Sequence, residues 1–166
     1  MLLYPRRTFH LQTGAPHWAD GAYTADGAIH AAIGGVARVE PDLERRLAHE
    51  LAHAFIANLS ADLAPRWLQE GLAQALSDPR PGSRPSPVEA MAVEDLDYRG
   101  TLDFTRSLLA EHGPEALRDA LASMGDGASV EEAFRRYLGV PVVDLFATWR
   151  ASSLTPAATA TLENAP

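Results

Sequence analysis

The sequence contains no cysteine among its 166 residues. This absence excludes disulfide frameworks, zinc sites built from thiolates, and catalysis by a cysteine nucleophile. Any metal ion that the chain binds must therefore be held by histidine and carboxylate side chains. At this length the chain is the size of one domain, and it can bury a hydrophobic core without covalent staples.

Excess positive charge and long apolar runs are also missing. The formal net charge is −8, and no basic stripe indicates binding to nucleic acid or to an anionic membrane surface. No apolar run approaches the roughly 20 residues that cross a bilayer, and the N-terminal MLLYPRRTFH lacks the features of a signal peptide. We therefore expect no nucleic-acid partner and no membrane segment in this chain. The compartment stays open, and an extracytoplasmic one is compatible with a chain excised from a longer precursor.

The first third of the sequence has the pattern of short strands and turns. Apolar residues flank the Pro5-Arg6-Arg7 stretch, and an Asp26-Gly27 pair separates two short segments of small, β-branched and aromatic residues. An aspartate-glycine pair between such segments predicts a hairpin. Its second arm should run from Ala28 to Ile33.

From Pro41 onward the apolar residues follow helical spacing. Pro41 suits the first turn of a helix, and two acidic residues follow it near the positive end of the helix dipole. Four apolar residues then recur at four-residue intervals, namely Leu43, Leu47, Leu51 and Phe55. We expect a helix to about Asn58, with this stripe facing the core.

Capping residues, glycines and prolines divide the remainder into further helices. They are predicted from Pro65 through RWLQEGLAQAL, from Ser86 to about Leu96, from Tyr98 to His112, from Pro114 to Met124, from Ser129 to Gly139, and from Pro141 to Trp149. The tail from Thr155 is rich in alanine and threonine without a period, and we expect it to be disordered. Residues 1–154 are thus predicted to form one domain, and residues 155–166 a tail.

The chemistry of the sequence is concentrated in His49-Glu50-Leu51-Ala52-His53. Residues four apart lie on one face of a helix, so the two imidazoles can meet at a single metal ion. Glu50 points about 100° further round, where a carboxylate can act as general base on a water.

Chance is the competing explanation for this motif, because the sequence has six histidines and the pattern is short. A random match somewhere in such a chain has odds on the order of one in a hundred. Helical phase adds a second argument, since His49 lies about 200° round the helix from Leu47. The histidine face is therefore opposite the apolar stripe, and we infer that the histidines are not needed for packing. His10, His17, His30 and His112 are interpreted as structural or surface residues.

A catalytic zinc site takes three protein ligands, so a third must come from elsewhere. Glu70 lies in the next predicted helix, after enough chain for a return pass against the first. It sits off the apolar stripe formed by Leu68, Leu72 and Leu76. Helical phase alone does not distinguish a ligand from a solvated surface carboxylate at this position.

The two segments together resemble a known family. LERRLAHELAHAF followed by PRWLQEGLAQAL is similar to the peptidase MA-like domains of the gluzincin clan of zinc metallopeptidases, whose pattern is H-E-x-x-H and then W-L-x-E-G-x-A. The resemblance implies that His49, His53 and Glu70 bind one zinc ion. It also implies that Glu50 is the general base in the hydrolysis of peptide bonds.

Further segments, covering roughly Leu2 to Arg150, resemble the same family in the expected order. LLYPRRTF, WADGAYTADGAIHAAIGG, YRGTLDFTRSLLAEHG and SVEEAFRRYLGVPVVDLFATWR carry this likeness. The resemblance implies an α+β, zincin-like fold, with a small N-terminal sheet packed on the HExxH helix and a mainly helical C-terminal half. The helix and strand that precede LLYP in the family are absent, so we expect this chain to be part of a larger polypeptide.

Two more residues enter the predicted site through the resemblance. Tyr98 occupies a position where related aminopeptidases use a tyrosine to stabilise the oxyanion, although a tyrosine packed on the core fits the pattern equally well. Gln74 lies one turn after Glu70, where the family often has glutamate. An amide there can orient a zinc-binding histidine but supplies no negative charge.

The substrate class follows from the same resemblance. In gluzincins a strand beside the active helix pairs with extended substrate, and GAIHAAIGG resembles that strand. The Gly-x-Met-Glu-Asn motif that holds a free N-terminus in related aminopeptidases is absent, which favours an endopeptidase acting on peptides or proteins. Two alternatives remain open. One is a catalytically silent binding module within a larger protein, and the other is a helical interaction domain with an accidental motif.

Overall fold

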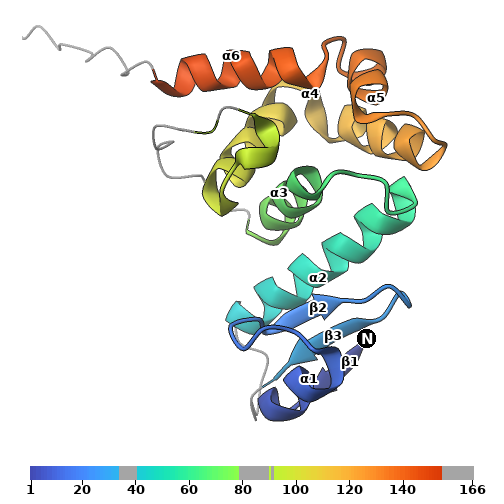
Figure 1. The fold of residues 1–166 in the computed structure, drawn as a ribbon, viewed down its shortest axis with the longest axis vertical. Coiled ribbons are helices and arrows are strands. Elements are labelled where there is room, and N and C mark those ends of the chain that lie inside the picture. The colour runs from blue at the N-terminus through green and yellow to red at the C-terminus, as the bar shows by residue number, and fades with distance from the viewer. Residues whose placement is uncertain (34–40, 79–89, 91, 155–166) are drawn as a thin grey trace, which may run out of the picture.

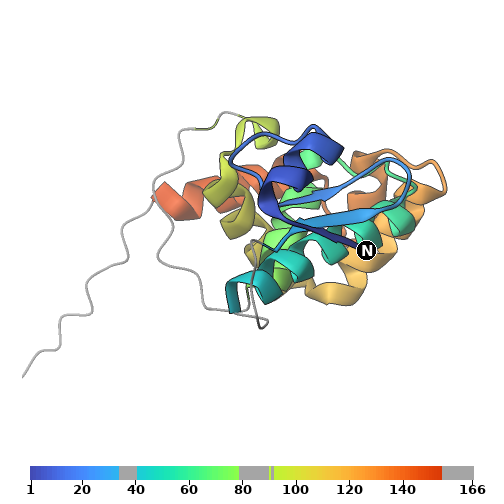
Figure 2. The same ribbon diagram turned by 90° about the horizontal axis from the view of Figure 1, so that it is seen from below.

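The computed structural model describes residues 1–33, 41–78, 90 and 92–154, and it is an α+β structure with a small sheet and mainly helical content. The elements are β1 (Leu2–Tyr4), α1 (Arg6–Thr13), β2 (Gly21–Tyr23), β3 (Ile29–Ala32), α2 (Pro41–Ser60), α3 (Arg66–Ser77), the 3-10 turn η1 (Val93–Asp95), α4 (Tyr98–Gly125), α5 (Val130–Tyr137) and α6 (Val142–Leu154). The sheet and α1 lie on one side of α2, and α3 to α6 lie on its other side (Figures 1 and 2). No described helix is long and apolar enough to cross a membrane.

The sheet has three strands in the order β1-β3-β2. β3 is central, because it pairs in parallel with β1, with Leu3 opposite Ala31, and antiparallel with β2, with Ala22 opposite His30. The predicted hairpin at Asp26-Gly27 is confirmed, and Gly27 takes a left-handed φ of 79° that favours glycine. β1 and β2 are therefore the two edges of this sheet.

A helix in the first third corrects the expectation of strands and turns there. α1 follows Pro5 directly and ends at Gly14, which takes the left-handed conformation with φ 66°. Among the side chains of α1 that the structure describes, Phe9 alone is fully buried, at 0% exposure. A single buried aromatic gives no helical period in the sequence, and contacts with β1 and β3 hold α1 in place.

The helices of the C-terminal half enclose the main core. An aromatic cluster lies at its centre and consists of Trp67, Phe104, Phe134, Phe146 and Trp149, with neighbouring ring centroids 5.2 to 6.0 Å apart. The predicted helices over these residues are confirmed, including the break at Gly113, where φ is 81° within α4. The capping box of Ser129 and Glu132 is confirmed as well.

Two predictions concern segments that the structure describes only in part or not at all. Of the helix expected from Ser86 to Leu96, residues 86–89 and 91 lie outside the described residues, and the described remainder contains the 3-10 turn η1 in place of the predicted helix. The tail from Thr155 also lies outside them.

The apolar stripe predicted to anchor α2 in the core is the main correction to the fold. Leu51 and Phe55 are 61% and 60% exposed, whereas Ala52 and Ile56 are buried. The reason is that α2 packs on the sheet and also on α3 and α4, and Ala52 and Ile56 belong to the core cluster formed with residues of α3 and α4. The predicted stripe is thus buried at Leu43, at the start of α2, and faces outward at Leu51 and Phe55.

Paired substitutions on α2 test this arrangement. Ile56→Ala is expected to lower the free energy of unfolding by about 2–5 kcal/mol, because it removes a core side chain that is 1% exposed. Phe55→Ala removes a side chain of similar size from the exposed stripe, and we expect a loss below about 1 kcal/mol. Urea unfolding of both variants measures the difference, and equal losses would contradict the packing of α2 described above.

Candidate metal centre

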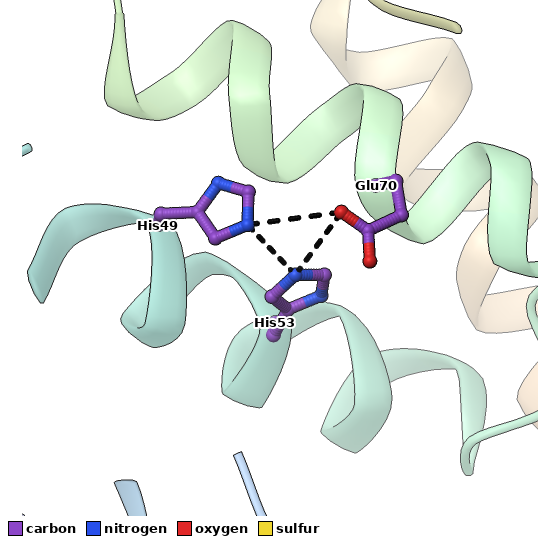
Figure 3. Close-up of side chains that lie close together, drawn as sticks. All are labelled: His49, His53 and Glu70. Carbon is purple, nitrogen blue, oxygen red and sulfur yellow. Dashed lines mark hydrogen bonds and ion pairs between the residues drawn. The ribbon is translucent and has the colours of Figure 1, made fainter. Parts of the chain in front are cut away.

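Two helices bring His49, His53 and Glu70 to one point. His49 and His53 lie one turn apart on α2, and Glu70 faces them from α3 (Figure 3). The Nε2 atoms of the histidines are 3.0 Å apart, and each lies 3.8 Å from Oε2 of Glu70. Among the described residues, these three form the one group that could hold a metal ion.

A tight turn between α2 and α3 makes this meeting possible. Ala61 and Asp62 take left-handed φ values of 47° and 61°, which non-glycine residues adopt only where other contacts support them. The backbone N–H of Asp62 donates to the carbonyl of Ala57 at 2.8 Å, and that of Leu63 donates to Ser60 at 2.9 Å. The chain therefore reverses within a few residues, and α3 returns along α2 with Glu70 beside His53.

The separations of the three ligand atoms match a small metal ion. A point in their plane that is equidistant from all three lies about 2.1 Å from each atom, within the usual range for nitrogen and oxygen ligands of a first-row metal. The three side chains are partly buried, with exposed fractions of 19%, 15% and 32% for His49, His53 and Glu70. One side of the site stays accessible to a ligand.

Burial keeps both imidazoles in the form that binds metal. It lowers the pKa of His49 below its ordinary value of 6.5, against the opposing effects of the Glu70 charge and of a hydrogen bond to the backbone of Ala73. Burial is also the main cause of the lowered pKa of His53, followed by the neighbouring charge of His49. Both rings are therefore neutral at pH 7.

The lowered pKa values predict a pH dependence for metal affinity. Because protons compete with the metal only where the imidazoles titrate, the affinity for zinc should stay level from pH 8 to about 6.5 and fall at lower pH. Isothermal titration of the Glu50→Gln protein measures this without a second titrating carboxyl at the site. A tenfold loss of affinity already between pH 8 and 7 would contradict the prediction.

Glu50 lies beside the group but is not part of it. It is 9% exposed, and burial, followed by the charge of Glu70, raises the pKa of its carboxyl to about 7. Its carboxylate lies directly against the backbone of β2 at Gly21, where any β-carbon would overlap Oε1 of Glu50. Gly21 thus provides the space that this carboxylate occupies, a role that the sequence analysis did not find.

His49, His53 and Glu70 form the candidate metal group. A cavity of about 980 Å³ opens over the metal group and Glu50. Its wall is formed by the segment before β2, by β2 itself, by the facing sides of α2 and α3, and by the start of α4. Besides the metal group, the lining includes Trp18, Gly21, Ala22, Tyr23, Arg46, Glu50, Arg66, Glu94 and Tyr98. The predicted oxyanion donor Tyr98 therefore lies in the same cavity, 67% exposed, and its role stays a prediction.

Gln74 is placed differently from Tyr98. It is 3% exposed, and within the described part of the chain neither atom of its amide has a hydrogen-bond partner. The backbone of the preceding residue, Ala73, is the group that hydrogen-bonds His49. The prediction that Gln74 orients a histidine stays a prediction. The hydrogen bond between His49 and the backbone of Ala73 could not be predicted, because backbone acceptors leave no signal in a sequence.

The prediction that the segment from Gly27 to Gly35 pairs with substrate is wrong for its described part. The arm from Ala28 to Ile33 contains β3, which already pairs on both sides with β1 and β2. β2 is the edge strand that lines the cavity. Asp20, the residue before β2, forms an ion pair of 2.9 Å with Arg46 of α2, a contact that the sequence does not indicate.

The remaining described histidines lie outside the group. His30 is buried in β3, hydrogen-bonds Thr24 at 3.1 Å and stacks on Tyr4, as a structural residue does.

No family model, curated protein or solved structure matches the chain. Chemically, the site offers two neutral imidazoles and one carboxylate for a metal, a second carboxylate of raised pKa beside them, and an open cavity above.

Proposed function

We propose that this chain is a zinc-dependent peptidase of the gluzincin type, with a peptidase MA-like, zincin-like domain. The observation that carries the proposal is the meeting of His49, His53 and Glu70 from two helices, with Glu50 buried beside them. The motif alone leaves chance as an explanation. A chance match, however, gives no reason for the Oε2 atom of Glu70 to lie 3.8 Å from the Nε2 atoms of both histidines. An accidental motif in a plain helical domain is disfavoured for the same reason.

Zinc is the ion that these residues suit best. Two imidazole nitrogens and one carboxylate oxygen form a usual protein ligand set of catalytic zinc, whereas calcium and magnesium prefer all-oxygen sites. The equidistant point about 2.1 Å from the ligand atoms agrees with zinc–nitrogen and zinc–oxygen distances. The set has three members, which leaves a position for water or substrate.

Glu50 is the proposed general base. Bound zinc would polarise the carbonyl that is attacked and favour ionisation of the attacking water. Glu50 would take the proton of that water and pass it to the amine that leaves. Burial raises the pKa of this carboxyl in the metal-free site, and a bound cation would favour the carboxylate form that accepts the proton.

Tyr98 and β2 complete the proposed site. The Tyr98 hydroxyl would donate to the developing oxyanion, a role supported by the place of Tyr98 in the lining of the same cavity. The edge of β2 that pairs with no other described strand would pair with the backbone of an extended peptide, a contact that tolerates many sequences. With no motif for a free N-terminus in the sequence, we favour cleavage within peptides over removal of N-terminal residues.

Gly21→Ala tests the position of Glu50 in this proposal. The added β-carbon would overlap a flexible side chain, so we expect the Glu50 carboxylate to move while the fold persists. The kcat for peptide hydrolysis should fall by about tenfold or more, because a general base must lie within hydrogen-bond reach of the proton it removes. Zinc content should stay at one equivalent. An unchanged kcat would show that Glu50 does not need this space, and Ala28→Ser, in the same hairpin but outside the cavity lining, is the matched control.

Digestion of a broad peptide library tests the function itself. The zinc-loaded protein is incubated with the library alone, with a chelator, and with the chelator followed by excess zinc. We expect cleavage that the chelator abolishes and zinc restores. A protein that carries zinc yet leaves the library intact under all three conditions would instead be a silent binding module. Gln74 favours this alternative, because its amide supplies no negative charge to the site.

A further inference from the structure

Trp18 is a large apolar side chain that the fold leaves 73% exposed. The other two tryptophans of the chain, Trp67 and Trp149, are 6% and 8% exposed within the aromatic core. An exposed indole forgoes the hydrophobic free energy that burial would give, and it gains that energy when a ligand covers it. Trp18 also lines the cavity over the metal group, so a ligand in that cavity would cover it.

The position of Trp18 relative to the proposed base is limited by the chain itself. Gly21, which abuts the Glu50 carboxylate, is only three residues further on. Three residues span at most about 10 Å, and an extended peptide advances about 3.3 Å per residue. Trp18 therefore lies within reach of substrate side chains up to about three residues from the bond that is cleaved.

Local contacts hold the segment that carries Trp18. The backbone N–H of Ala19 donates to the carbonyl of Pro16 at 2.9 Å, which closes a turn around the tryptophan. The next residue, Asp20, forms the ion pair with Arg46 of α2. Because the segment is anchored on the helix that carries His49 and His53, the backbone around the indole needs little ordering when a ligand binds.

The wall around Trp18 determines which side chain fits there. The lining residues that are near Trp18 in the chain are mostly small and apolar, namely Ala15, Pro16, Ala19, Ala22 and Ala25, and they include the polar Tyr23 and Thr24. The charged lining residues nearest to Trp18, Asp20 and Arg46, pair with each other at 2.9 Å. Asp62, Arg66 and Glu94 come from other elements, namely the α2–α3 turn, the start of α3 and η1. This side of the cavity suits an apolar group and not a charged one.

We propose that Trp18 is a specificity-determining residue that contacts a large apolar side chain of the peptide, within three residues of the cleaved bond. The inference rests on the proposed peptidase function. It adds a substrate preference that neither the metal group nor backbone pairing to β2 would produce.

Library digestion by wild type, Trp18→Ala and Trp18→Phe tests this preference. Wild type should favour large apolar residues at one position within three of the cleaved bond, and Trp18→Phe should keep that preference. For a peptide with phenylalanine there, Trp18→Ala should raise KM about tenfold with kcat nearly unchanged, as expected for loss of a central aromatic contact. For the same peptide with glycine, KM should change less than twofold. An identical cleavage profile in all three proteins would overturn the inference.

A binding measurement separates this inference from the peptidase proposal. Zinc-loaded Glu50→Gln protein is titrated with two end-blocked pentapeptides that differ only in a central phenylalanine or glycine, while acrylamide quenching reports the exposed tryptophan. The phenylalanine peptide should protect Trp18, and the effect should disappear in the Trp18→Phe background. Protection without any hydrolysis by wild type would reject the peptidase but keep the contact. Equal quenching with both peptides would reject the contact. The contact would also be rejected if Trp18→Ala changed the self-association of the protein and not its peptide binding. Leu11→Ala, which removes another exposed apolar side chain at 75% exposure, is the matched control outside the cavity.

Discussion

Replacing His53 with alanine is expected to lower the affinity for zinc by more than about a hundredfold. Changes to residues that merely support metal ligands already cost 10–100-fold in affinity, and loss of a direct ligand should cost more. His53 is one of only two nitrogen donors in the group, and its Nε2 lies 3.0 Å from that of His49. Isothermal titration with zinc, supported by metal analysis of the purified protein, measures the loss.

His17→Ala is the matched control for that prediction. His17 is exposed and lies outside the metal group, so this variant should bind zinc as wild type does. Circular dichroism should show the same helix content in both variants, because neither imidazole is part of the core. Wild-type zinc affinity in His53→Ala would contradict the proposed ligand set.

Replacing Glu50 with glutamine is expected to abolish hydrolysis while the metal remains bound. Glutamine has nearly the same size but cannot accept the proton of the attacking water, and loss of a general base typically costs 10²–10⁴-fold in rate. Glu50 is outside the metal group, so zinc content should stay at one equivalent. The measurement compares kcat for a peptide found in the library digest with the zinc content of the same preparation.

Glu44→Gln is the matched control on the same helix. Glu44 is exposed in the first turn of α2 and does not line the cavity, so kcat should stay within twofold of wild type. If Glu50→Gln turned over peptide at the wild-type rate, Glu50 would not be the base, although the zinc site could remain. The two results together separate metal binding from catalysis.

The elements with strong local signals were predicted well from the sequence. The capping box at Ser129 and the hairpin glycine at Gly27 are local in origin, because a hydroxyl cap and a left-handed φ depend on one or two residues. The same holds for His49 and His53, since helical periodicity alone places them on one face. These features do not depend on what packs against them.

The features that the sequence could not supply depend on contacts between distant segments. Periodicity found the apolar face of α2 but not what covers it, and so Leu51 and Phe55 were wrongly placed in the core. The sequence left Glu70 equally compatible with a metal ligand and with a surface carboxylate. Its position beside the histidines depends on the turn at Ala61, which returns α3 along α2. Gly21 carries no signal of its own, because the close approach of Glu50 exists only in the folded chain.

X-ray absorption at the zinc edge, on protein expressed with added zinc, tests the central claim most directly. The claim is that His49, His53 and Glu70 form one zinc centre. We predict one zinc per chain, four nitrogen or oxygen ligands at about 2.0–2.1 Å, and the scattering pattern of two imidazoles. Less than about half an equivalent of zinc, or a coordination shell without two imidazoles, would contradict the claim.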